Sequence, residues 1–114
     1  MNELANMNCV QVKRDGAPLS AEQIAEYKPQ LPDWKVFEKQ GIKRLERTYK
    51  FMNFREALEF TNQVGEIAEQ EDHHPLIQTE WGKVTLNWWT HVIGGLHRND
   101  FIMAAKSDQR YQSK

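Results

Sequence analysis

The sequence predicts an α+β fold of two layers, in which helices pack on one face of a four-stranded, mainly antiparallel sheet. Three observations support this prediction: two pairs of strand-like segments, an amphipathic helical segment between the pairs, and capping patterns that start helices. The 114 residues suit a single compact domain, expected at 20–114 after a poorly defined N-terminal segment at 1–19. We expect a β-β-α-β-β-α core that is preceded by a helix.

The first helix and the first pair of strands are predicted in the N-terminal half. Residues 20–23, Ser-Ala-Glu-Gln, form a capping-box pattern, and a short helix should follow until a proline ends it. Two strands are then expected at 34–37 and 42–51, with a turn around Gly41. Arg47 is the polar exception on the apolar face of the second strand.

The longest helix is predicted after Asn53, whose side chain suits a helix cap. Apolar residues then recur at three- and four-residue spacing, and the helix is expected to end at Glu69 or Gln70. The last helix should begin after a cap at Asn99 or Asp100. These two helices are expected to cover the sheet.

The second pair of strands is predicted at 76–81 and 84–90. Gly82-Lys83 should join them as a two-residue type II′ turn, because glycine suits the first position of that turn. Alternate residues of the second strand are apolar and should lie under the helices. Trp89 falls on the opposite face, where an exposed tryptophan indicates a partner chain or a ligand.

Three histidines are the candidate functional residues. His73 and His74 lie between acidic residues and Pro75, and His91 follows at the far end of the predicted hairpin. A two-residue loop would place His74 opposite His91, whereas a three-residue loop would place His73 there, with Cβ atoms about 5 Å apart in either register. Pro75 favours an extended backbone before it, so only one of the adjacent rings should share the side of His91.

Imidazoles can both accept and donate a proton near neutral pH. The nearby carboxylates of Glu69, Glu71 and Asp72 can keep one ring charged while another stays neutral, as a paired general acid and base require. The same pattern is compatible with a plain surface position, because surface histidines account for many His-His-Pro matches. It is also compatible with a zinc site of three histidines, although adjacent histidines diverge on an extended chain.

The composition of the chain argues against several classes of function. Lys and Arg total 15 against 16 Asp and Glu with the signs interspersed, so nothing indicates nucleic acid or anionic lipid as a partner. No apolar run is long enough to span a membrane and the first residues lack a secretory pattern, so we expect a soluble cytoplasmic protein. The single Cys9 excludes an intramolecular disulfide and is expected to be idle near a poorly ordered terminus.

These residues resemble the motif of the pterin-4a-carbinolamine dehydratases, also known as dimerisation cofactors of a homeodomain transcription factor. The family pattern is an acidic or polar residue, three residues, His-His-Pro, an aromatic residue, a histidine and an aspartate. This chain carries them as Glu69, His73, His74, Pro75, Trp81, His91 and Asp100. The resemblance covers roughly residues 20–110. Within it, this chain looks like the bacterial members that accompany phenylalanine hydroxylase. Some relatives carry an arginine before the aspartate, where this chain has Asn99.

The resemblance implies dehydration of 4a-hydroxytetrahydrobiopterin to quinonoid dihydropterin, which recycles the pterin cofactor of aromatic amino acid hydroxylases. It implies no metal and no organic cofactor, and it implies a homodimer or homotetramer with phenylalanine hydroxylase as a candidate partner. A non-catalytic, dimeric partner of a hydroxylase or of a transcription factor is the alternative, and a metal-dependent enzyme is a third.

The resemblance also implies which residues form the site. The implied catalytic residues are His73, His74 and His91, with His73 and His91 as acid and base and His74 in binding. The implied substrate-binding residues are Glu69, Asp72, Trp34 and Pro75. Trp81 and Asp100 are implied as motif residues.

Overall fold

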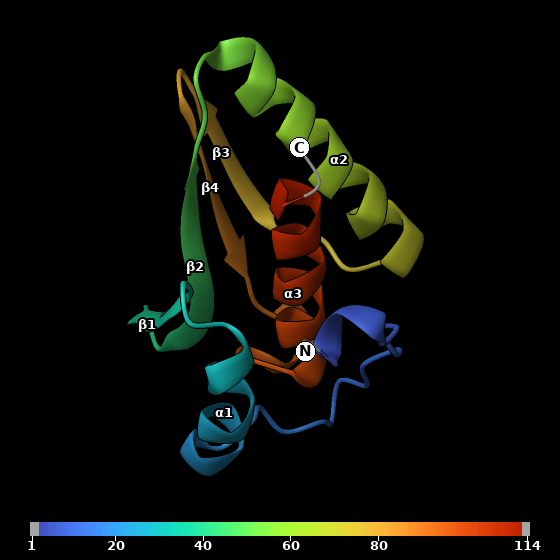
Figure 1. Ribbon diagram of the computed structural model, residues 1–114. Helices are drawn as coiled ribbons and strands as arrows, with labels where there is room; N and C mark the ends of the chain where they lie inside the picture. Colours follow the sequence, from blue (N-terminus) through green and yellow to red (C-terminus); the bar gives the residue numbers. More distant parts are fainter. Residues whose placement is uncertain (1–2, 113–114) are drawn as a thin grey trace.

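The computed structural model describes residues 3–112, and it has the predicted two-layer α+β architecture (Figure 1). The four strands are β1 (Lys35–Lys39), β2 (Ile42–Lys50), β3 (Leu76–Glu80) and β4 (Lys83–Trp88). They form one sheet in the order β1-β2-β4-β3, and all neighbouring strands are antiparallel. The three helices are α1 (Ala21–Tyr27), α2 (Phe54–Glu71) and α3 (Arg98–Gln112). Helices α2 and α3 cover one face of the sheet, which confirms the predicted fold class.

The capping patterns start the helices where they were predicted. Before α1, the Ser20 hydroxyl accepts the Gln23 N–H, and the Gln23 side chain accepts the Ser20 N–H, which completes a capping box. Before α2, the Asn53 side chain accepts the Glu56 N–H at 2.9 Å. Helix α2 runs to Glu71, one or two residues beyond the expected end.

The last helix starts earlier than expected. It begins at Arg98, so His97 takes the capping position that was predicted for Asn99 or Asp100. The Asp100 carboxylate reaches back to the His97 N–H at 2.9 Å, which is the backward half of a capping box. Asp100 therefore stabilises the helix start from inside the first turn.

The predicted register of the second hairpin is wrong. Glu80 pairs with Lys83, so the two-residue loop is Trp81-Gly82 rather than Gly82-Lys83. Gly82 has φ 78° and occupies the second loop position, where a type II turn needs a positive φ. Strand β4 ends at Trp88, before it can carry His91 opposite either adjacent histidine.

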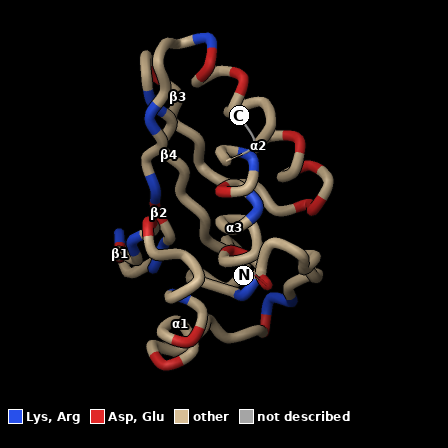
Figure 2. The backbone as a smooth tube through the Cα atoms, viewed as in Figure 1, with Lys and Arg blue, Asp and Glu red and all other residues tan. Residues whose placement is uncertain are grey.

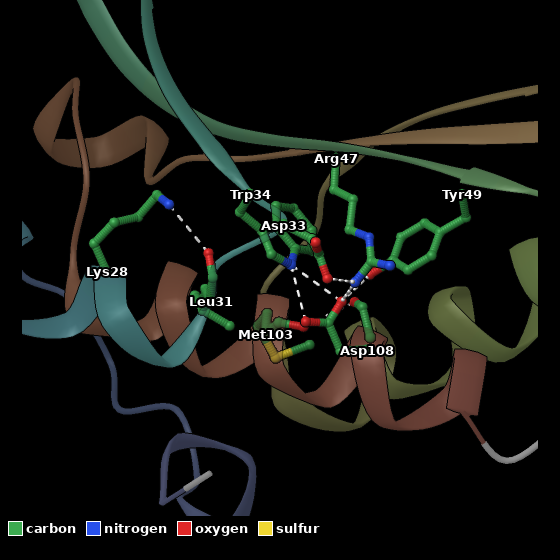
Figure 3. A network of polar contacts seen from close by, with 9 residues as sticks. Lys28, Leu31, Asp33, Trp34, Arg47, Tyr49, Met103 and Asp108 are labelled. Atoms are coloured by element: carbon green, nitrogen blue, oxygen red, sulfur yellow. Dashed lines mark hydrogen bonds and ion pairs between the residues drawn. The ribbon is translucent and has the colours of Figure 1, made fainter.

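A largely buried polar cluster around Asp108 joins α3 to the sheet (Figure 3). The Asp108 carboxylate accepts the Trp34 indole N–H at 3.0 and 3.1 Å, the Arg47 guanidinium at 2.7 Å and the Tyr49 hydroxyl at 2.5 Å. Burial and the Asp108 carboxylate raise the pKa of Tyr49, which stays a neutral donor. Arg47 lies on the core side of β2 because its charge is paired there.

The N-terminal segment contributes to the core. A short 3₁₀ turn, η1 (Leu4–Asn6), lies beside α3 in Figure 1, and Leu4 and Ala5 are buried in the same core as the helices. The Lys106 ammonium donates to the Ala5 carbonyl at 3.0 Å. Residues 4–6 are thus packed against the domain that was expected to begin at residue 20.

Charged residues are distributed over both layers. Figure 2 shows acidic residues along α2, and Lys and Arg residues on the strands. Both signs meet on the sheet face away from the helices, where the Lys35 ammonium lies 3.2 Å from the Glu46 carboxylate. Within residues 3–112, none of the helices is both long and apolar enough to cross a membrane.

Candidate functional site

A cavity of about 640 Å³ opens where α2, α3 and the segment after β4 meet. Its walls are residues 71–74 at the end of α2, residues 90–92 after β4, residues 9–12 of the N-terminal segment, and Asn99 of α3. All three histidines that were singled out from the sequence line this one cavity. Its size suits a small organic molecule.

His73 is fixed by a buried carboxylate. Its Nε2 lies 2.6 Å from Asp100 Oδ1, and its ring stacks on Trp88 with centroids 5.8 Å apart. Asp100 is completely buried, and its Oδ2 accepts the Thr90 hydroxyl at 2.8 Å and the His97 N–H at 2.9 Å. Because Nε2 faces Asp100, Nδ1 is the ring nitrogen of His73 that remains for a molecule in the cavity.

His74 also has a carboxylate partner, but in a more exposed place. Its Nε2 is hydrogen-bonded to Glu69 Oε2 of α2, and about half of the His74 side chain is exposed. Helix α2 ends just before these rings because Asp72 adopts the left-handed conformation, with φ 52°. This turn directs His73 towards α3 and leaves His74 beside the last turn of α2.

His91 reaches the cavity through a tight turn rather than a strand. It begins the 3₁₀ turn η3 (His91–Ile93), which is closed by a bridge in which the Thr90 N–H donates to the Gly95 carbonyl at 2.8 Å. The His91 ring lies 4.6 Å from the ring of Trp89, measured between centroids. Trp89 is itself covered by the Arg44 guanidinium, 3.8 Å from its ring centroid.

The remaining residues implied by the motif occupy different places. Asp72 lines the cavity, whereas Glu69 lies outside the lining and contacts His74. Trp34 is buried in the core against Asp108 and does not line the cavity. Pro75 follows the histidines into β3 without lining the cavity, and Trp81 is 73% exposed at the tip of the β3–β4 hairpin.

Three residues in or beside the cavity were given no role in the site from the sequence. Asp100 was a motif residue without a role, and the structure places it on His73. His97 accepts the Asn99 N–H on Nδ1 at 2.9 Å, and burial lowers the pKa of His97. Burial, followed by the charge of Glu71, raises the pKa of Cys9 to about 12, so this thiol stays protonated. Its contacts come from residues far away in the sequence, so no local pattern marked it.

The site offers imidazoles with distinct partners. His73 contacts a buried carboxylate and His74 contacts an exposed one. His91 instead lies against an aromatic ring. A carboxylate on one ring nitrogen fixes the tautomer and stabilises the charged ring, which suits transfer of a proton at the other nitrogen. Among residues 3–112, no three His, Cys, Asp or Glu side chains are arranged to hold a metal ion.

Comparisons with known proteins place the chain among relatives. Residues 17–110 match the family model described as pterin 4 alpha carbinolamine dehydratase. A relative from Microcystis aeruginosa is 52% identical over all of this chain and 98% of its own, and one from Chlorobium limicola is 56% identical over 94% and 95%. Both are provisionally named pterin-4-alpha-carbinolamine dehydratase. A crystal structure from Brucella melitensis, named transcriptional coactivator/pterin dehydratase, is 28% identical with a TM-score of 0.74, covering 82% of this chain and 97% of that one.

Proposed function

The chain belongs to the pterin 4 alpha carbinolamine dehydratase family, and from that premise we propose that it dehydrates 4a-hydroxytetrahydrobiopterin to quinonoid dihydropterin and water. The observation that carries the proposal is the meeting of His73, His74 and His91 on one cavity of suitable size. The reaction needs a proton donor, a proton acceptor and a means of holding a flat ring system. This cavity offers a candidate for each.

The reaction breaks the C4a–O bond and forms a double bond between C4a and N5. The leaving hydroxyl gains a proton and departs as water, and N5 loses its proton, so the net proton count is unchanged. We assign His73 as the base for N5, because its Nε2–H can be donated to Asp100 while Nδ1 accepts the proton. We assign His91 as the acid for the hydroxyl, and His74 with Glu69 to substrate binding.

Such positioned proton transfers contribute on the order of 10²–10⁴-fold to a rate. The proposed role is to recycle the pterin cofactor of aromatic amino acid hydroxylases, with phenylalanine hydroxylase as the candidate partner. We also propose a homodimer or homotetramer. The sheet face away from the helices supports this, because Leu76 is 41% exposed there and none of the described helices covers it.

The test is dehydration of enzymatically generated carbinolamine, followed with and without a chelator. We expect a rate well above the buffer background that the chelator does not change. His73→Ala and His91→Ala should each lower kcat, and His74→Ala should mainly raise KM. A wild-type rate equal to the background would refute the proposed activity, and full turnover by the His73→Ala/His91→Ala double variant would refute the assignment of acid and base.

A regulatory binding role is the second candidate, because the Brucella melitensis protein is named a coactivator as well as a pterin dehydratase. The same double variant separates the two roles. If binding to a regulator or hydroxylase survives in the double variant while turnover is lost, the chain has both functions.

A further inference from the structure

The N-terminal segment is fixed at two points, one before and one after the residues 9–12 that line the cavity. Upstream, Ala5 is buried, and its carbonyl accepts the Lys106 ammonium of α3. Downstream, the Leu19 N–H donates to the Leu96 carbonyl at 2.8 Å. Residues 7–12 run between these points without regular structure, as the blue trace between η1 and α1 in Figure 1 shows. A segment that is fixed at both ends can serve as a wall.

Asn99 holds the middle of this segment with both ends of its amide. Its Oδ1 accepts the Val10 N–H at 3.0 Å, and its Nδ2 donates to the Val10 carbonyl at 2.7 Å. Asn99 is only 2% exposed, so both bonds are shielded from water. One residue earlier, the Cys9 N–H donates to Glu71 Oε1 at 2.7 Å. Backbone groups of the segment are therefore hydrogen-bonded to side chains of α3 and α2.

These two contacts lie next to the residues that place His73. Asn99 precedes Asp100, whose carboxylate contacts His73. Glu71 is the last residue of α2, two positions before His73. The end of α2 and the start of α3 thus hold both the N-terminal segment and the ring assigned as the base.

The segment presents apolar surface to the cavity. Val10 lines it and is 50% exposed, and Val92 from the η3 turn lines it and is 49% exposed. Contact between these exposed valines and an apolar face of a ligand would bury apolar surface and so favour binding. A flat bicyclic ring has two such faces, whereas its edge carries the polar groups that the histidines can reach.

We propose that residues 9–12 form a wall of the pterin site and that Asn99 is the positioning residue that holds this wall in place. The inference rests on the proposed function and extends it, because it assigns substrate binding to a segment before the part of the chain that matches the family model. The wall contacts the face of the ring, and proton transfer stays with the histidines. Loss of the wall therefore weakens binding and raises KM more than it lowers kcat.

The first experiment compares Asn99→Ala with Asn8→Ala as the matched control. Asn8 is an exposed residue of the same segment and does not line the cavity. The probe is 7,8-dihydrobiopterin, whose Kd is measured by calorimetry, beside kcat and KM for the carbinolamine. We expect Asn99→Ala to raise Kd and KM about tenfold, since the wall is no longer preorganised, with kcat within about threefold of wild type. Asn8→Ala should match the wild type.

Hydrogen exchange gives a readout that does not depend on activity. The Val10 amide should exchange faster in Asn99→Ala than in Asn8→Ala, because its acceptor is gone. Faster exchange at Val10 together with an unchanged Kd would overturn the inference, since the wall would then be released without effect on binding.

A second variant decides the matter if Asn99→Ala does not fold. Val10→Glu changes a half-exposed side chain and should leave the fold intact, yet it puts a carboxylate against the ring face and should raise Kd at least about tenfold. An unchanged Kd in Val10→Glu overturns the inference while wild-type turnover leaves the proposed function standing. A wild-type chain that neither binds dihydrobiopterin nor turns over the carbinolamine overturns both.

Discussion

Replacing Asp100 by asparagine should reverse the tautomer of His73 while the number of side-chain heavy atoms stays the same. Asp100 Oδ2 accepts the His97 backbone N–H, which can only donate. The amide oxygen of Asp100→Asn must therefore stay at that position, and the amide nitrogen must face His73 Nε2. Nε2 then has to accept, so the proton of the neutral His73 ring moves to Nδ1, the nitrogen that does not face Asp100.

The size of the effect follows from the role assigned to Nδ1. A neutral ring protonated at Nδ1 cannot take the N5 proton there, so the whole contribution of the base is lost. That contribution is on the order of 10²–10⁴-fold in kcat, or about 3–5.5 kcal/mol in the activation free energy. KM should change little, because the packing of His73 on Trp88 is kept.

The assay combines steady-state kinetics with nitrogen NMR of the His73 ring, which distinguishes the two tautomers. Asp108→Asn is the matched control, because it makes the same substitution on the same helix, but in the polar cluster of Figure 3 and away from His73. The control should lose stability but keep kcat per folded molecule. An Asp100→Asn variant whose kcat stays within about threefold of wild type, with the proton still on Nε2, would refute the reasoning.

Three further predictions concern stability. Asp108→Ala removes the acceptor of two buried donors, the Trp34 indole N–H and the Tyr49 hydroxyl, and leaves Arg47 paired with Asp33 alone. It should lower the free energy of unfolding in urea by about 3–5 kcal/mol, and a loss below about 1 kcal/mol would contradict the cluster's role. Burial lowers the pKa of His97 in the folded chain, so the free energy of unfolding should fall as the pH drops below about 6.5, the pKa of an unfolded histidine. In His97→Asn the amide oxygen can still accept the Asn99 N–H. This variant should flatten the pH dependence of urea unfolding between about pH 7 and 5. Gly82→Ala should cost about 1 kcal/mol in the same assay because of its positive φ, and no loss would indicate that the turn can change type.

Local patterns in the sequence were enough to predict the fold class and most elements. The caps at Ser20 and Asn53 were found because a capping side chain bonds within three residues of itself. The apolar alternation of β4 was found because a strand buried on one face repeats every second residue. The hairpin register was missed because it depends on which loop position glycine takes, and both placements fit the same letters.

The sequence by itself determined the two layers, the amphipathic helix and the presence of three imidazoles beside carboxylates. Only the tertiary structure decided that His91 enters through a turn, that Asp100 rather than Asp72 fixes His73, and that Trp34 belongs to the core. It also decided that residues 9–12 line the cavity. The physical reason is distance along the chain: the bonds from Asn99 to Val10 and from Asp108 to Trp34 join residues 89 and 74 positions apart. Such polar pairs leave no period in the sequence and form only when packing brings the two side chains together.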